Sequence, residues 1–167
     1  MRTLRPPFIV LGVLCVGFLV WIACSAAWLP ERVAVHFGSS GEANGWMTRS
    51  SHLLSIGGLG VGVPLLFAGL VLLIGWIPAQ FINVPRRDYW LAPEREAETR
   101  GLILRGLLWL GCLMVVFFSG IQFLLVQANQ VTPAHWPMQW GLPVTGGFLV
   151  GVGLWLAYFI GYFAKER

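Results

Sequence analysis

His36 and Glu42 are the residues whose chemical types best suit proton transfer or metal binding in this sequence. An imidazole beside a carboxylate can act as an acid and a base, and it can share a metal ion with a second imidazole such as that of His52 or His135. The chain has no HxxxH or HExxH spacing, so such a site would need three separate loop positions to converge. We therefore expect no catalytic residue, no metal and no cofactor, and we expect His36 and Glu42 to make hydrogen bonds that fix their loop.

The cysteines do not indicate a covalent or metal framework either. Cys15, Cys24 and Cys112 are odd in number, lie within apolar stretches and form no CxxC pair. We expect them to act as small apolar side chains.

Four long stretches that are almost free of charge separate the polar segments. Apolar residues make up 57% of the 167 residues and charged residues 11%, against roughly 25% charged in soluble domains. A chain this short cannot hide so much apolar surface in a water-soluble core, and each stretch has the roughly 20 residues that a helix needs to cross a bilayer. We predict an all-α membrane protein, a single domain over residues 1–167 with four transmembrane helices at about 8–28, 53–77, 101–126 and 142–163.

Three features of these spans have more than one interpretation. The first span also resembles a secretory signal peptide, although its length favours a retained anchor. The second and fourth spans are rich in glycine, and the small-xxx-small patterns 58–62 and 147–151 predict helix contact faces, within the chain or in a homo-oligomer. Their similar composition also leaves open a repeat of two helical hairpins.

The predicted span centres contain no Asp, Glu, Lys or His, which disfavours ion-coupled transport. Arg105 lies about one turn inside the third span, from where its long side chain can reach the interface. Ser119 and Gln122 form the main polar pair of that span, and we expect them to bond between helices.

Lys and Arg are distributed unequally between the two sides of the predicted bundle. A cytoplasmic N-terminus places nine of them inside and two outside, which is the bias seen in membrane proteins. The inside set is Arg2, Arg5, Arg86, Arg87, Arg95, Arg100, Arg105, Lys165 and Arg167, and the outside set is Arg32 and Arg49. We therefore expect both termini in the cytoplasm. Because these residues flank the spans and form no cationic face, the net charge of +4 does not indicate a nucleic-acid partner.

The first outer loop, residues 29–52, has the pattern of a short strand followed by a turn. Over 32–37, Val33, Val35 and Phe37 alternate with Ala34 and His36. The stretch 38–45 supplies turn-forming residues, among them three glycines and Asn44. We predict a small strand-and-turn cap over the outer helix ends, with the valines, Phe37 and Trp46 facing the helices. The second outer loop, 127–141, is predicted to be a short interfacial segment.

The inner loop, residues 78–100, is predicted to form an elbow between the second and third spans. Asn83 and Pro85 favour a turn, and the aromatic residues 89–90 suit the inner membrane interface. Pro93 suits the first turn of a helix, where Glu94 and Glu96 would complement the positive end. Glu96 is also four residues before Arg100, so the two are expected to pair.

Both polar loops resemble one known family of bacterial membrane proteins. The outer motif is Leu29-Pro30-Glu31-Arg32, His36-Phe37 and Gly41-Glu42-Ala43-Asn44-Gly45-Trp46, and the inner motif is Asn83-Val84-Pro85-Arg86-Arg87-Asp88-Tyr89-Trp90-Leu91-Ala92-Pro93-Glu94-Arg95. Together they resemble the domain-of-unknown-function family numbered sixteen-forty-eight, which is related to SdpI-type immunity proteins. The resemblance covers about residues 10–105, although Ala34 and Asn44 stand where the family often has proline and aspartate.

The resemblance implies a multi-pass protein of a bacterial cytoplasmic membrane. Protection against a secreted toxin, or capture of a repressor at the membrane, is implied for the SdpI-type branch alone. The motifs also identify two candidate functional surfaces. The outer cap comprises His36, Phe37, Gly41, Glu42, Asn44, Gly45 and Trp46, and the inner elbow comprises Asn83, Pro85, Arg87, Asp88, Tyr89, Trp90, Pro93, Glu94 and Arg95.

We expect a non-enzymatic accessory, sensor or immunity-like protein that contacts the lipid bilayer and binds a protein partner through these two surfaces. The alternative is a small transporter or lipid-handling protein. A membrane enzyme that uses His36 and Glu42 is the least favoured interpretation.

Overall fold

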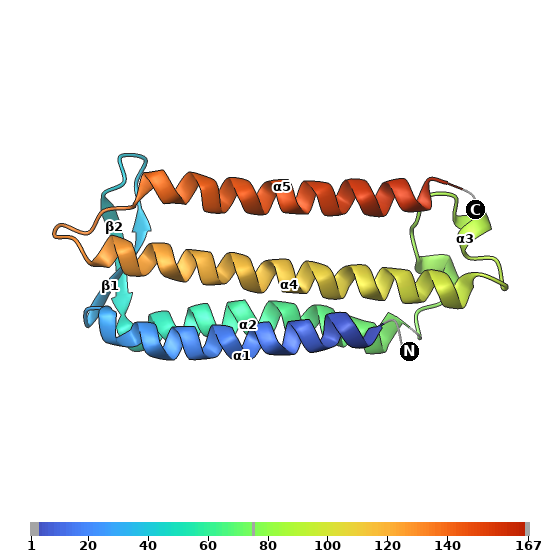
Figure 1. The fold of residues 1–167 in the computed structure, drawn as a ribbon, viewed down its shortest axis with the longest axis horizontal. Coiled ribbons are helices and arrows are strands. Elements are labelled where there is room, and N and C mark those ends of the chain that lie inside the picture. Colours follow the sequence, from blue (N-terminus) through green and yellow to red (C-terminus); the bar gives the residue numbers. More distant parts are fainter. Residues whose placement is uncertain (1–3, 75, 166–167) are drawn as a thin grey trace.

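The computed structural model describes residues 4–74 and 76–165, which form an elongated bundle of four long helices (Figure 1). The long helices are α1 (Arg5–Ser25), α2 (Arg49–Ile74), α4 (Glu96–Asn129) and α5 (Met138–Phe163), and the short ones are η2 (Ala26–Trp28), η3 (Ala79–Phe81) and α3 (Arg87–Trp90). All four long helices are long and apolar enough to cross a membrane. The predicted fold class is therefore confirmed, and the protein contacts lipid.

Each of the four long helices begins several residues before its predicted span. The second helix begins at Arg49 rather than near residue 53, so His52 lies inside a membrane-length helix. The third helix is 34 residues long and ends at Asn129. It therefore reaches beyond the predicted span at both ends and carries polar residues into the two loop regions.

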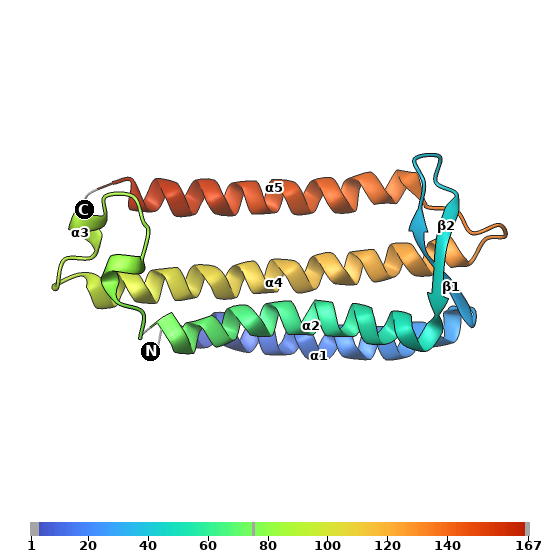
Figure 2. The same cartoon turned by 180° about the vertical axis from the view of Figure 1, so that it is seen from behind.

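Helix α4 occupies the centre of the bundle. It packs against α1, α2 and α5, whereas α5 packs mainly against α4, and both views place α5 on the opposite side of α4 from α1 and α2 (Figures 1 and 2). Within α5, the buried residues are Gly141 and Phe163, one near each end. Most of the α5 surface is therefore left uncovered by the other helices, and one face of α5 contacts α4 through residues such as Phe148 and Trp155.

The core between α1, α2 and α4 is built from large apolar side chains, including Leu11, Phe18, Leu108 and Val115. Gly60 of α2 permits the closest approach, because a Cβ atom there would lie 2.1 Å from a ring carbon of Phe18. Most glycines of the two predicted small-xxx-small patterns make no such close contact.

Gly58, Gly62 and Gly147 would have no atom within 4 Å of an added Cβ, and Gly151 packs against Leu113 at 3.3 Å. The prediction of contact faces within the chain is therefore wrong for the first pattern and holds for one residue of the second. A role for these glycines in a homo-oligomer stays a prediction. The three cysteines are free thiols, with Cys15 and Cys112 buried and Cys24 exposed on α1.

A chain of buried polar side chains joins three helices near their outer ends. The imidazole Nε2 of His52 lies 2.9 Å from Oε1 of Gln122, whose amide nitrogen donates to Ser25 Oγ at 2.8 Å. We call His52, Gln122 and Ser25 the buried polar chain. His52 is the fourth residue of α2 and lies outside the predicted span, so the span centres remain free of histidine.

The predicted partnership of Ser119 and Gln122 is only half right. Gln122 does bond between helices, to α1 and α2. The hydroxyl of Ser119 instead donates to the carbonyl of Val115 in its own helix at 2.8 Å, as serine commonly does in helices.

Candidate functional site

The first outer loop folds into a two-stranded antiparallel hairpin of β1 (Arg32–Phe37) and β2 (Ala43–Thr48), so the predicted strand-and-turn cap is confirmed. Arg32 pairs with Thr48 and Ala34 with Trp46, and the register then shifts around His36. The predicted alternation of the two faces along the strand is not regular. The neighbouring residues Val33 and Ala34 are both fully buried, next to the shift in register.

The hairpin is attached to α4 through Asn129, a residue that belongs to neither of the two sequence motifs. Asn129 accepts a hydrogen bond from the amide of Ala34 at 2.8 Å and donates one to the carbonyl of Ala34 at 3.0 Å. The same amide nitrogen lies 2.8 Å from the carbonyl of Leu125, one turn earlier in α4. Beneath the strand, Val33 packs with Leu29 and Val126 in a small apolar cluster.

The second outer loop docks on the tip of the hairpin instead of lying alone at the interface. The backbones of Glu42 and His135 pair in an isolated antiparallel β-bridge, and the amide of Trp136 donates to the carbonyl of Gly41 at 2.8 Å. The rings of Phe37 and Trp136 lie 5.4 Å apart. The cap therefore consists of the hairpin together with the loop that connects α4 to α5.

Two glycines of the outer motif are required by this packing. Gly41 has a φ of +88°, which favours glycine, and a Cβ there would lie 2.5 Å from Cε1 of His135. A Cβ at Gly45 would lie 2.9 Å from the Cβ of His36 on the neighbouring strand. Their presence in the motif thus has a structural explanation.

The polar members of the outer motif remain on the surface of the cap. His36, Glu42 and Asn44 are exposed, and within the described chain the side chains of His36 and Glu42 have no hydrogen-bond or ion-pair partner. The prediction that these two side chains hydrogen-bond to fix the cap is therefore wrong, because backbone bonds and Asn129 fix it instead.

Trp46 also differs from its prediction. Its side chain is 45% exposed rather than packed on the helices, and the guanidinium of Arg32 lies 5.7 Å from its ring centroid. The outer face of the hairpin thus presents an aromatic ring and a cation side by side.

The histidines have separate surroundings. His52 belongs to the buried polar chain, whereas the imidazole of His135 lies 3.1 Å from the carbonyl of Ser40 in the hairpin turn. Among residues 4–74 and 76–165, no three His, Cys, Asp or Glu side chains form a group that could hold a metal ion.

The inner elbow divides into a buried part and an exposed part. Trp90 is 3% exposed, donates its indole N–H to the carbonyl of Phe163 at 2.8 Å, and receives a hydrogen bond on its own carbonyl from Thr99 at 2.6 Å. Tyr89 packs against Trp90 at 5.3 Å, with the guanidinium of Arg95 at 4.1 Å from the Tyr89 ring. These residues join the elbow to the last turn of α5, which corrects the expectation of an aromatic patch at the membrane interface.

The remaining candidate residues of the elbow are exposed, namely Asn83, Pro85, Arg87, Asp88, Pro93 and Glu94. Pro93 and Glu94 precede α4, which starts at Glu96, so the predicted helix start at Pro93 is wrong.

The predicted pair of Glu96 and Arg100 is confirmed at 2.6 Å. The Arg100 guanidinium also donates to the carbonyls of Ile74 and Ile77. It therefore satisfies the carbonyl of the last residue of α2 and a carbonyl of the segment that follows the helix.

Comparison with known proteins gives one match. Residues 12–61 match the family model of a domain of unknown function, DUF1648, which confirms the resemblance of the outer motif. No curated protein and no solved structure matches the chain. The inner-loop motif lies outside the matched residues. The chain therefore carries a DUF1648 domain that runs from α1 through the outer hairpin into α2.

Proposed function

We propose that this protein is a non-enzymatic membrane protein that recognises a protein partner through its outer cap. The observation that carries the proposal is the exposed Arg32–Trp46 pair on a hairpin that is fixed from beneath. Tryptophan and arginine are the residues most enriched at energetic hot spots of protein interfaces. A rigid hairpin that holds them in place loses little conformational entropy on binding.

The cap is rigid for reasons that the contacts make explicit. Asn129 holds the middle of β1, and the segment around His135 and Trp136 holds the turn between the strands. A free two-stranded hairpin is only marginally stable in water. The contacts from α4 and the second outer loop therefore support a preorganised surface.

We assign the exposed part of the inner elbow to a second, weaker surface. Arg87, Asp88 and Glu94 are accessible there, but Trp90, the large aromatic residue of the motif, is already occupied by Phe163. Single charged residues at the rim of an interface usually contribute little affinity. The cap is therefore the better candidate for partner recognition.

The orientation and location are part of the same proposal. The bias of Lys and Arg toward the elbow end supports a cytoplasmic elbow with both termini inside, and the bacterial family resemblance supports a bacterial cytoplasmic membrane. The cap would then face the outside. A membrane-impermeant maleimide should label Ser39→Cys in intact cells of a variant without native cysteines, and it should label Asp88→Cys only after lysis.

Site-specific photo-crosslinking tests partner recognition. A photoreactive phenylalanine at Trp46 should give a discrete, saturable protein adduct in intact membranes. The same probe at Trp140 is the matched control, since Trp140 is an exposed tryptophan in the first turn of α5 near the cap. Adding Asn129→Ala to the Trp46 probe should weaken the adduct while membrane insertion is unchanged.

Equal adducts from Trp46 and Trp140, or an adduct that forms only from an elbow position such as Asp88, would contradict recognition through the cap.

A further inference from the structure

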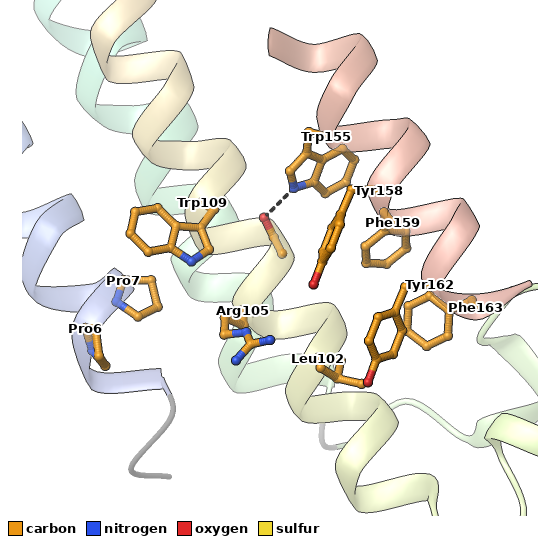
Figure 3. Close-up of a pocket in the computed structure, with 11 residues that line it drawn as sticks. Pro6, Pro7, Leu102, Arg105, Trp109, Trp155, Tyr158, Phe159, Tyr162 and Phe163 are labelled. Atoms are coloured by element: carbon orange, nitrogen blue, oxygen red, sulfur yellow. Dashed lines mark hydrogen bonds between the residues drawn. The ribbon is translucent and has the colours of Figure 1, made fainter. Parts of the chain in front are cut away.

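A cavity of about 390 Å³ opens at the elbow end of the bundle, between α1 and α5 on the surface of α4. This volume lies within the roughly 300–1,000 Å³ typical of ligand pockets. Figure 3 shows the side chains that line it, chiefly aromatic rings from α4 and α5 and two prolines at the start of α1. The lining includes Arg105, Gly106, Trp109, Trp155, Tyr158 and Phe159.

The aromatic wall of the cavity depends on Gly106. The indole N–H of Trp155 donates to the carbonyl of Gly106 at 3.0 Å, and a Cβ at Gly106 would lie 3.2 Å from the ring of Phe159. The rings of Trp155 and Phe159 stack at 5.1 Å. The wall is thus a fixed apolar surface rather than a collection of mobile side chains.

Arg105 is the cationic side chain in this lining. In the described part of the chain it has no ion pair, hydrogen bond or stacked ring. An arginine within a membrane helix is costly unless it pairs with another group or reaches the interface. The cavity therefore contains a positive charge whose counter-charge does not come from the described protein.

Two further donors lie near this charge. The indole nitrogen of Trp109 and the hydroxyl of Tyr158 are both turned toward the side of the cavity where the Arg105 guanidinium lies (Figure 3). Within the described residues, neither group has a hydrogen-bond partner. Three donors of different types and no carboxylate thus line one apolar cavity.

We propose that this cavity binds an anionic phospholipid, with the phosphate on Arg105 and part of an acyl chain along the aromatic wall. Guanidinium groups bind phosphate oxygens with strong, charge-assisted hydrogen bonds, and basic pockets between membrane helices are known sites for acidic head groups. A single cation among apolar rings suits one phosphate diester that carries a hydrocarbon tail. A soluble polyphosphate would require several cations. This inference does not rest on partner recognition by the cap.

Native mass spectrometry of the full-length protein tests the proposal, with phosphatidylglycerol and phosphatidylcholine of identical acyl chains as probes. The wild type should retain phosphatidylglycerol about tenfold more strongly, which is about 1.4 kcal/mol. Arg105→Gln should abolish this preference. Arg87→Gln removes the same charge from an exposed position in α3 at the same end of the molecule and should keep it.

Tyr158→Phe gives a second measure that does not depend on the folding of Arg105→Gln. Its side chain is 67% exposed, so the protein should fold normally, and its retention of phosphatidylglycerol should fall roughly threefold for the loss of one hydrogen bond to the phosphate.

Equal retention of the two lipids by the wild type would overturn the proposal, as would an equal loss in Arg87→Gln and Arg105→Gln. Displacement of phosphatidylglycerol by inorganic phosphate alone would assign the cavity to a soluble anion and also overturn it.

Discussion

Replacing Asn129 by alanine should loosen the outer cap while leaving the helix bundle in place. The amide side chain of Asn129 is bonded to both the N–H and the carbonyl of Ala34, at 2.8 Å and 3.0 Å. Ala34 is 0% exposed, so water cannot readily replace these bonds while the hairpin stays docked. The shortened side chain would leave two buried backbone groups without their side-chain partner.

The magnitude follows from the number of groups affected. An unsatisfied buried donor or acceptor costs about 1–3 kcal/mol, so two such groups should cost about 2–4 kcal/mol if the cap partly relaxes. This free energy corresponds to an increase of roughly 30-fold to 1,000-fold in the population of the open hairpin. Because amides exchange through such local opening, the exchange rate should rise by a similar factor.

Hydrogen–deuterium exchange in detergent, followed for peptides that cover residues 32–48, is the direct measurement. Asn83→Ala is a matched control, since Asn83 is an exposed asparagine in the elbow and its loss should change stability by less than about 0.5 kcal/mol. Exchange of the Asn129→Ala hairpin at the wild-type rate would contradict a role of Asn129 in holding the cap. Faster exchange spread evenly over all four helices would show that Asn129 acts on the whole bundle and not on the cap.

Three further changes have equally specific expected outcomes. Gln122→Leu removes the centre of the buried polar chain and should lower the free energy of unfolding by about 1–3 kcal/mol in thermal or denaturant melts. Gly41→Ala should destabilise the cap by about 1–3 kcal/mol because of its positive φ and its contact with His135, whereas Gly62→Ala, with no atom within 4 Å, should melt like the wild type. Trp90→Phe should remove about 0.5–1.5 kcal/mol of attachment at the end of α5, seen as faster exchange at residues 159–165.

The features predicted well from the sequence are those set by composition and local pattern. Four apolar stretches of sufficient length predicted four helices, because a bilayer requires every backbone polar group in a span to be bonded internally. Alternation at 32–37 and turn residues after it predicted the first strand and the turn between the first two helices, whereas Asn44 and Gly45 lie in the second strand, β2, which was not predicted. The pair of Glu96 and Arg100 followed from helical spacing alone.

Long-range contacts between polar groups were not predictable in this way. Asn129 and Ala34 are 95 residues apart, and no local pattern indicates that an asparagine at a helix end will pair with a strand. Tryptophan is a residue type that commonly lies at a membrane interface, but the indole N–H of Trp90 donates to the carbonyl of Phe163, 73 residues away. In both cases the partner is a backbone group, which the identity of a side chain does not reveal.

The continuous length of α4 has a mechanical consequence. The helix meets the hairpin at Asn129 and the elbow at Thr99, thirty residues earlier, a distance of roughly 45 Å at 1.5 Å per residue. An intact α-helix resists compression along its axis because its backbone hydrogen bonds would have to break. If a displacement of β1 moved the Asn129 end of α4, the Thr99 end would move with it. The carbonyl of Trp90 and the end of α5, at the opposite end of the bundle, would then move as well.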